Sequence, residues 1–171
     1  RLAEDIRPFV AMADALRGQQ LSAPEIFTSD LENGLAILED LGIETVVNAS
    51  GPIPERYTEA VAVLAKLHAG QLPDNVLLGS ETYRIPPYDL DALLIEVELL
   101  TEWYVPHAAA HLSSGAIATF GNLWRSTLRE IIDGPKTWVL RDYHSPNIIW
   151  LPDREGLLRA GIIDFQDCVM G

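Results

Sequence analysis

Two short segments near the end of the chain carry residues that could do chemistry together. In the first, Asp142 precedes Asn147 by five residues, and in the second Asp164 directly follows the β-branched pair Ile162 and Ile163. Phosphoryl transfer needs a carboxylate that orients and deprotonates the attacking hydroxyl, and oxygen ligands that hold Mg²⁺ on the phosphates. Asp142 could be that base, and Asn147 and Asp164 could be two metal ligands. The pattern therefore favours a site for phosphoryl transfer.

The elements beside these segments must bring them together. The sequence predicts a strand that enters the first segment, a strand that leaves it, a turn and a returning strand, at residues 138–140, 148–151, 153–156 and 157–163. Antiparallel pairing of the last two strands would bring Asp142 and Asn147, at one end of a hairpin, next to Asp164. This is the geometric reason that the two segments can form one site.

Upstream of this hairpin the chain is predicted to be mostly helical. Apolar residues at helical spacing, with proline, glycine and Asp89 at suitable ends, predict helices over residues 2–18, 55–69, 90–105 and 117–132. Gly18 is expected to cap the first helix and Pro106 to stop the third. Two apolar runs at residues 26–27 and 35–38 flank a polar turn and predict a further hairpin.

The last three helices are each expected to bury one stripe of side chains. The predicted stripes are Ala60, Val61, Leu64 and Leu67; Leu90, Leu93, Leu94, Val97 and Leu100; and Ile117, Phe120, Trp124, Leu128 and Ile131.

Composition narrows the class of protein. The chain has 171 residues, of which 48% are hydrophobic and 22% charged, as in ordinary globular domains. A formal net charge of −13 argues against nucleic acids and anionic membranes as partners. No apolar run reaches the roughly 18 residues of a membrane span. Cys168, the one cysteine, excludes an intramolecular disulfide, and we expect a cytoplasmic protein.

Four segments, in order, resemble the aminoglycoside phosphotransferase and choline-kinase-like family of small-molecule kinases. They are residues 38–42, residues 64–69, the segment around Asp142, and Ile163-Asp164-Phe165. Within the family, residues 83–87, the helix carrying Glu98, Glu102 and Trp103, and the Asp164 segment look most like bacterial kinases that phosphorylate N-acetylmuramate or N-acetylglucosamine at the anomeric hydroxyl.

The resemblance implies an α+β, protein-kinase-like fold. Residues 1–42 would be the end of the small lobe and the hinge, and residues 43–171 a mostly helical large lobe with the catalytic and metal-binding loops. It implies ATP and Mg²⁺ as cofactors and a small polar acceptor, such as an amino sugar or an aminoglycoside.

The family's functional positions fall on particular residues of this chain. Asp142 would be the catalytic base, Asn147 and Asp164 the Mg²⁺ ligands, and Glu39, Asp40 and Leu41 the linker whose backbone bonds adenine. Glu98, Glu102 and Trp103 could line a sugar pocket, although Trp103 could equally pack in the core. His144 is expected to brace the catalytic loop, and Gln166 to belong to loop structure or to support a neighbouring metal ligand. Asp167 would reach a second metal or bond the backbone of its own loop.

Some family features are missing, and they keep other hypotheses open. Leu140 stands where the family has a histidine, and the first helix offers only Asp14 as a partner for the nucleotide-binding lysine, with Glu4 and Asp5 at its start. A Gly-rich phosphate loop and its lysine are absent from these 171 residues. We therefore expect a piece of a longer kinase that is inactive alone.

The first alternative is a catalytically inactive kinase-like module that binds a nucleotide or a partner. The second is a helical scaffold, which predicts that Asp142, Asn147 and Asp164 are scattered. A zinc site at His107 and His111 is disfavoured, because Pro106 precedes them and they lack the glutamate of an HExxH motif.

Overall fold

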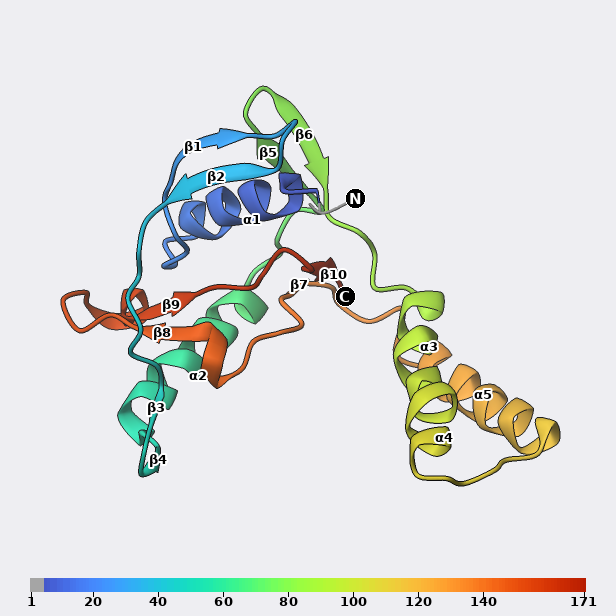
Figure 1. Ribbon diagram of the computed structural model, residues 1–171. Helices are drawn as coiled ribbons and strands as arrows, with labels where there is room; N and C mark the ends of the chain where they lie inside the picture. Colours follow the sequence, from blue (N-terminus) through green and yellow to red (C-terminus); the bar gives the residue numbers. More distant parts are fainter. Residues whose placement is uncertain (1–4) are drawn as a thin grey trace. The chain divides into compact units, whose positions relative to one another are not determined.

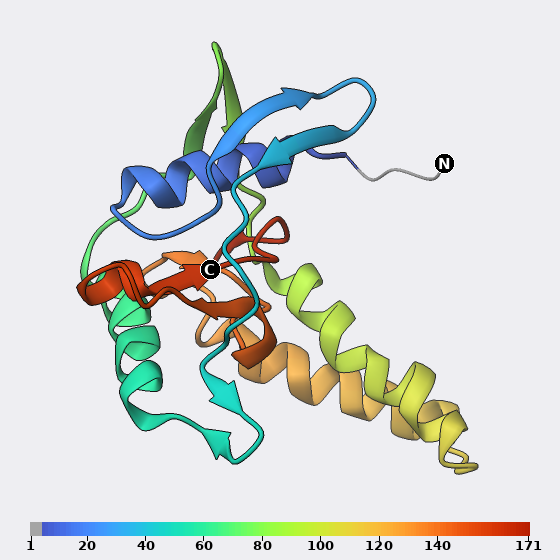
Figure 2. The same ribbon diagram turned by 60° about the vertical axis from the view of Figure 1, so that its left-hand side comes forward.

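The computed structural model describes residues 5–171, which form two compact units. Of the described residues, the larger unit comprises 5–86 together with Thr137–Met170, and the smaller one comprises Pro87–Lys136 and Gly171. Figures 1 and 2 show short two-stranded sheets and helices in the larger unit and only helices in the smaller one. The fold is therefore α+β, as predicted.

The larger unit begins with helix α1 (Arg7–Gly18), whose buried residues are Val10, Ala11, Met12, Ala13 and Leu16. The prediction that this helix starts at residue 2 is wrong for residues 5 and 6, and residues 2–4 lie outside the described residues. Asp5 accepts a hydrogen bond from the Arg7 N–H (3.0 Å), which replaces a helical bond at the first turn. Gly18 is the last helical residue rather than the cap, and Gln20 makes the turn with φ 57°.

The hairpin of β1 (Ile26–Asp30) and β2 (Leu35–Leu38) is antiparallel, as predicted. Its turn is closed by the Asp30 carboxylate, which accepts hydrogen bonds from the Asn33 N–H (3.0 Å) and the Asn33 amide (2.7 Å). The Asn33 amide also lowers the pKa of Asp30. Gly34 follows with φ 70°, a conformation that glycine adopts without strain.

Helix α2 (Pro54–Ala69) begins and ends where the sequence predicts. A small antiparallel pair, β3 (Val47–Asn48) and β4 (Gly51–Pro52), precedes it. The helix buries Ala60, Val63 and Leu67, whereas Val61 is 60% exposed. The prediction for Val61 is wrong, because the buried stripe follows steps of three and four residues from Ala60 and Val61 lies one step to its side.

A hairpin that the sequence analysis missed follows α2. Strands β5 (Asn75–Leu78) and β6 (Glu81–Arg84) pair in antiparallel register, and both pack against α1. In both views the hairpin lies beside α1 (Figures 1 and 2). Gly79, with φ 60°, makes the tight turn between the two strands.

The predicted hairpin at the end of the chain is confirmed. Strand β8 (Ile148–Trp150) pairs antiparallel with β9 (Ala160–Ile162), and β7 (Trp138–Val139) pairs with β10 (Val169–Met170). The returning strand starts at Ala160 rather than at residue 157, because Gly156–Arg159 first make a 3₁₀ turn. Gly156 enters this turn with φ 52°.

The smaller unit consists of α3 (Leu90–Leu99), a π-helical turn (Leu100–Tyr104), α4 (Val105–His107) and α5 (Ser114–Arg129). Asp89 caps α3, as predicted, by accepting a hydrogen bond from the Ala92 N–H (3.0 Å). Pro106 does not stop the helical run, contrary to prediction. The wider π turn ends at Tyr104, two residues before the proline, and it includes Glu102, whose carbonyl the proline ring would meet in an ordinary turn.

The predicted stripes of the smaller unit are wrong in most positions. Only Leu94 and Leu128 of the ten residues in these two stripes are buried, and Ile131 lies beyond the end of α5 and is 65% exposed. Helix α5 also starts three residues before the predicted position, because Ser113 caps it through the Ala116 N–H (3.1 Å). Among residues 5–171, no helix is both long and apolar enough to cross a membrane.

Candidate active site

The loop between β7 and β8 carries Asp142 and Asn147. It turns sharply at Arg141, whose φ is 62°, and the Asp142 N–H then donates to the Leu140 carbonyl (2.7 Å). A single 3₁₀ turn (Ser145–Asn147) ends the loop, and the Asn147 N–H donates to the His144 carbonyl (2.9 Å). This turn fixes the backbone of Asn147, the residue that directly precedes β8.

Asp164 follows β9 at the same end of the ribbon. The register pairs Ile148 with Ile162, and the Ile163 N–H donates to the Asn147 carbonyl (3.1 Å). Asp164 has φ 59°, a left-handed conformation that is uncommon for a residue with a side chain. The turn leaves Asp164 exposed and sends the next residue, Phe165, into the core.

The Asn147 amide joins the two loops. Its Nδ2 donates to the Asp142 carbonyl and to Oδ2 of Asp164, both at 3.0 Å, and lies 3.4 Å from Nε2 of His144. The three residues singled out from the sequence therefore meet at one end of the β8–β9 ribbon. They are not scattered, as the helical-scaffold alternative predicted.

Gln166 contacts the candidate metal ligand Asp164 directly, in line with the supporting role considered for it. Its Nε2 donates to Oδ1 of Asp164 (2.7 Å), so both carboxylate oxygens of Asp164 accept a hydrogen bond from a neutral amide. The Asp164 side chain is thus oriented before any ligand binds. Asp167 is exposed in the same loop, and both of the roles considered for it stay predictions.

Two aromatic residues that sequence reasoning missed anchor the loops. Phe165 is 0% exposed and stacks on Phe9 of α1, with ring centroids 5.0 Å apart. Tyr143 donates its hydroxyl proton to the Ala60 carbonyl of α2 (2.8 Å), and burial raises the pKa of this tyrosine. Each aromatic residue directly follows a candidate aspartate in the sequence. This position could have identified both residues as anchors of the loops.

The predicted adenine linker, residues 39–41, connects the β1–β2 hairpin to the β8–β9 ribbon. The Glu39 N–H donates to the Glu25 carbonyl (2.8 Å), which extends the β1–β2 ladder by one rung. Asp40 accepts a hydrogen bond from the Gly42 N–H (2.8 Å), which closes a turn. Leu41 packs over Gly161 of β9, where an added Cβ would come within 3.1 Å of its Cδ1.

The remaining candidates lie in the smaller unit. Glu98 is in α3, and Glu102 and Trp103 are in the π-helical turn. Trp103 is 71% exposed, so the alternative that it packs in the core of this unit is wrong. Its role in a sugar pocket, with Glu98 and Glu102, stays a prediction.

The side chains fit a magnesium site at Asn147 and Asp164 better than a zinc site at His107 and His111. His107 ends α4 and His111 lies in the following loop, so they do not share a helix face. Within residues 5–171, no three His, Cys, Asp or Glu side chains gather as a metal site. One carboxylate and one amide, those of Asp164 and Asn147, suit Mg²⁺, which prefers oxygen ligands and keeps several waters.

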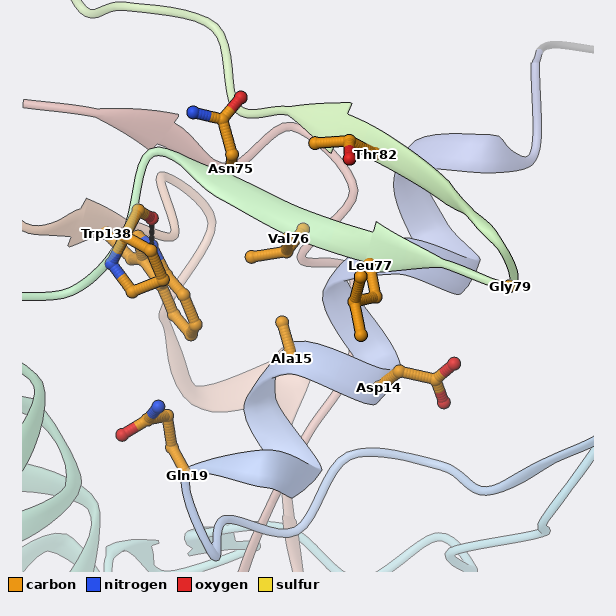
Figure 3. Close-up of a pocket in the computed structure, with 10 residues that line it drawn as sticks. Asp14, Ala15, Gln19, Asn75, Val76, Leu77, Gly79, Thr82 and Trp138 are labelled. Atoms are coloured by element: carbon orange, nitrogen blue, oxygen red, sulfur yellow. Dashed lines mark hydrogen bonds between the residues drawn. The ribbon is translucent and has the colours of Figure 1, made fainter.

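A pocket of about 630 Å³ lies between α1 and the β5–β6 hairpin. Val76 and Leu77 of the hairpin and Ala15 of α1 are among the residues that line it (Figure 3). Asp14, considered as a lysine partner, lines this pocket, and it lies about 140° around α1 from Phe9. Asp14 therefore faces away from the side of α1 that holds the Asp164 loop.

The loops joined by Asn147 have the residue types and the strand support of a kinase-like phosphotransferase. Residues 1–171 match the model of the phosphotransferase enzyme family (APH), and the chain belongs to this family. The predicted resemblance is confirmed at this level.

Curated relatives carry the name N-acetylmuramate/N-acetylglucosamine kinase. The chain is 33% identical to the protein of that name from Caulobacter vibrioides over 165 residues, which are 95% of this chain and 46% of the relative. It is 29% identical over 174 residues to the one from Pseudomonas aeruginosa, covering 98% and 46%, and 32% identical over 172 residues to the one from Pseudomonas putida, with the same coverage. The chain thus spans about half the length of these relatives.

Proposed function

We propose that the protein transfers the γ-phosphoryl group of ATP to a hydroxyl of a small polar molecule in the cytoplasm, with an amino sugar as the first choice. The observation that carries this proposal is the Asn147 amide, which joins the Asp142 loop to the Asp164 carboxylate at 3.0 Å. Family membership supports the reaction class, and the names of the relatives support the amino sugar.

Asp142 would act as the base. Its carboxylate would accept a hydrogen bond from the acceptor hydroxyl and take the proton as the oxygen forms its bond to phosphorus and the bond to ADP breaks. The loop supports this role because the Asp142 backbone is bonded on both sides, to Leu140 through its N–H and to His144 and Asn147 through its carbonyl. A fixed base does not have to be oriented during the reaction.

Asp164 and Asn147 would hold Mg²⁺, which supplies positive charge against the phosphates when bound. The Asp164 carboxylate is already oriented by Asn147 and Gln166. The Asn147 amide could complete the pair of protein ligands by turning its oxygen, in place of Nδ2, toward the ion. Because Asp142, Asp164 and Asp167 add negative charge beside a polyphosphate, metal-free nucleotide should bind poorly.

The nucleotide and the acceptor would use other parts of the chain. Residues 39–41 would bond adenine through the backbone, in a kinase-like arrangement with a small lobe ending near residue 42. Glu98, Glu102 and Trp103 would contact the sugar, with the Trp103 ring against pyranose C–H groups. The exposure of Trp103 leaves its face available for such a contact.

A second candidate is an inactive kinase-like module that binds nucleotide without transfer. Retention of Asp142, Asn147 and Asp164 favours the enzyme.

An ATP-consumption assay on the full-length protein tests both candidates. We expect turnover with N-acetylmuramate or N-acetylglucosamine rather than with aminoglycosides or choline, and a loss of about 10²- to 10⁴-fold in kcat for Asp142→Asn. Undiminished turnover in that variant would refute the base. Binding of Mg²⁺ and ATP without turnover of any acceptor would support the inactive module.

A further inference from the structure

The side chain of Glu39, on the predicted adenine linker, is the centre of a charged cluster. Its Oε1 pairs with Nη2 of Arg154, and its Oε2 lies 3.7 Å from Nη1 of Arg17 and accepts a hydrogen bond from the Glu25 N–H (3.2 Å). The side chains of Glu39 and Arg154 are only 25% and 29% exposed. A partly buried, multiply bonded carboxylate is held more firmly than one in an exposed ion pair.

The Arg154 side of the cluster reaches the β8–β9 ribbon. Arg154 belongs to the turn of this ribbon, and its Nη1 donates to the Ser22 hydroxyl (2.7 Å). Ser22 is 1% exposed, donates its own proton to the Leu158 carbonyl (2.6 Å), and accepts a hydrogen bond from the Ile162 N–H (2.7 Å). The residues after α1 are therefore fastened to the strand that leads to Asp164.

The Arg17 side of the cluster reaches α1. Arg17 lies in the last turn of this helix, and it donates to the Ala23 carbonyl (3.2 Å) and to the Glu25 carboxylate (3.3 Å). One carboxylate thus connects the end of α1, the start of β1, the linker and the ribbon turn.

This arrangement constrains the linker backbone. The Glu39 N–H and the Glu39 carboxylate both bond to Glu25, on the β1 side of the linker. The remaining polar group of the residue is its carbonyl, which belongs to the backbone predicted to bond adenine. Holding the other groups fixes the direction of that carbonyl relative to the ribbon that ends at Asn147 and Asp164.

We propose that Glu39, Arg154 and Arg17 form a clamp that positions linker residues 39–42 on the β8–β9 ribbon and so sets the nucleotide in register with the metal loops. The clamp residues are positioning residues, since they act through the linker backbone. The placement of the nucleotide rests on the proposed function. The contacts of the clamp are present in the protein without ligand.

The first test measures amide hydrogen exchange in the nucleotide-free, full-length protein. Glu39→Gln and Arg154→Met are each expected to speed exchange of residues 38–42 by about tenfold, because the linker loses its anchor. Glu44→Gln is a matched control, since it removes a carboxylate that pairs with Arg56 (2.8 Å) a few residues further along the chain. Exchange of residues 38–42 that is the same in the clamp variants and in the control would overturn the clamp.

The second test measures kinetics and nucleotide affinity in the same variants. Arg154→Met is expected to raise the KM for ATP by about 5- to 10-fold and to change kcat and the acceptor KM by less than about twofold. Arg154→Lys should recover part of the loss, because it keeps the charge but cannot bond Glu39 and Ser22 with a planar fork. Equal losses in kcat and in both KM values would contradict positioning and indicate general destabilisation.

The two proposals can fail separately. If the wild-type protein binds no ATP in the presence of Mg²⁺, the proposed function fails, and the exchange experiment still decides whether the clamp exists. If ATP binds equally well to wild type and Arg154→Met, the positioning role fails while the proposed function stands.

Discussion

The two compact units of the chain differ in how far they bury their own apolar side chains. The larger unit has a closed core in which Met12, Leu16 and Phe165 are 0% exposed. In the smaller unit only Leu94, Thr101 and Leu128 are buried, although the unit is rich in large apolar residues. Those left exposed are Ile95, Leu99, Leu100, Trp103, Tyr104, Leu112, Ile117, Leu123, Trp124 and Ile131.

The difference shows what each unit can fix by itself. The loops of Asp142 and Asp164 are anchored by Tyr143 and Phe165, which pack on helices of their own unit. In the smaller unit α3 packs against α5, and two paired helices can bury only one narrow stripe each. Precise geometry is therefore expected at the loops, and weaker local stability in α3 and α5.

Phe165→Ala should have the largest effect on stability. The variant removes a fully buried ring that stacks on Phe9, and we expect a loss of about 3–5 kcal/mol in the free energy of unfolding. Urea denaturation followed by far-UV circular dichroism measures it. Trp103→Ala, which removes a ring that is 71% exposed in the smaller unit, should change the same quantity by less than about 0.5 kcal/mol.

Phe165→Leu keeps most of the volume and should cost less than about 1.5 kcal/mol, so it remains folded for comparison if the alanine variant does not. Similar losses for Phe165→Ala and Trp103→Ala would show that the two units do not differ in the way proposed.

Matched leucines sharpen the comparison. Leu16→Ala in α1, at a position 0% exposed, should cost about 2–5 kcal/mol. Leu128→Ala in α5, at a position 6% exposed, should cost no more than about 2 kcal/mol, because few residues of this unit are buried and the site can relax. Equilibrium denaturation of both variants tests this. A larger loss for Leu128→Ala would reverse the ranking of the units.

The same difference explains which sequence predictions held. The α2 limits, the β1–β2 hairpin and the β8–β9 ribbon were predictable, because proline, turn residues and alternating patterns act locally. The buried stripes of the helices were predicted poorly, because burial of a helix face depends on which other element packs against it. Leu100 fits a helical stripe by spacing, yet it is 46% exposed because no other element covers it within its unit.

The candidate site divides in a similar way. Asp142, Asn147 and Asp164 could be picked from residue type and spacing, and the register of the ribbon brings them together. A supporting role for Gln166 was among the alternatives, but the geometry of its contact with Asp164 could not be predicted, since it depends on the left-handed turn at Asp164. The cluster around Glu39 joins residues more than a hundred positions apart, and no local pattern reveals such pairing.

Alkaline pH should weaken the larger unit. Burial raises the pKa of the Cys168 thiol from 9.0 to about 12, and burial also raises the pKa of Tyr143. Above about pH 9 the unfolded chain ionises at Cys168 while the folded protein does not, so stability is full below this pH and falls toward pH 12. Each group contributes at most about 1.4 kcal/mol of destabilisation per pH unit.

Denaturation midpoints measured from pH 8 to 11 test this effect. Cys168→Ala is expected to show a shallower decline than wild type, because one of the groups whose pKa is raised by burial is gone. The native thiol should also react slowly with a disulfide reagent at pH 8 and rapidly after unfolding. Fast reaction in the folded state would contradict burial of Cys168.

The smallest expected effect concerns how the helices begin. In the smaller unit, α3 and α5 start with side-chain caps from Asp89 and Ser113, whereas α2 starts with proline in the first turn and no side-chain cap. Helices with little burial depend more on such local bonds. Asp89→Ala should therefore cost about 1 kcal/mol, seen as faster hydrogen exchange in the first turns of α3.

Asp89→Asn is the control, because asparagine caps about as well as aspartate and should change exchange little. If the alanine variant leaves α3 exchange unchanged, contacts beyond the cap must hold this helix, and the smaller unit would then be better packed than its exposed leucines indicate. If Asp89→Asn is as damaging as alanine, the charge at the helix start matters more than the hydrogen bond to Ala92.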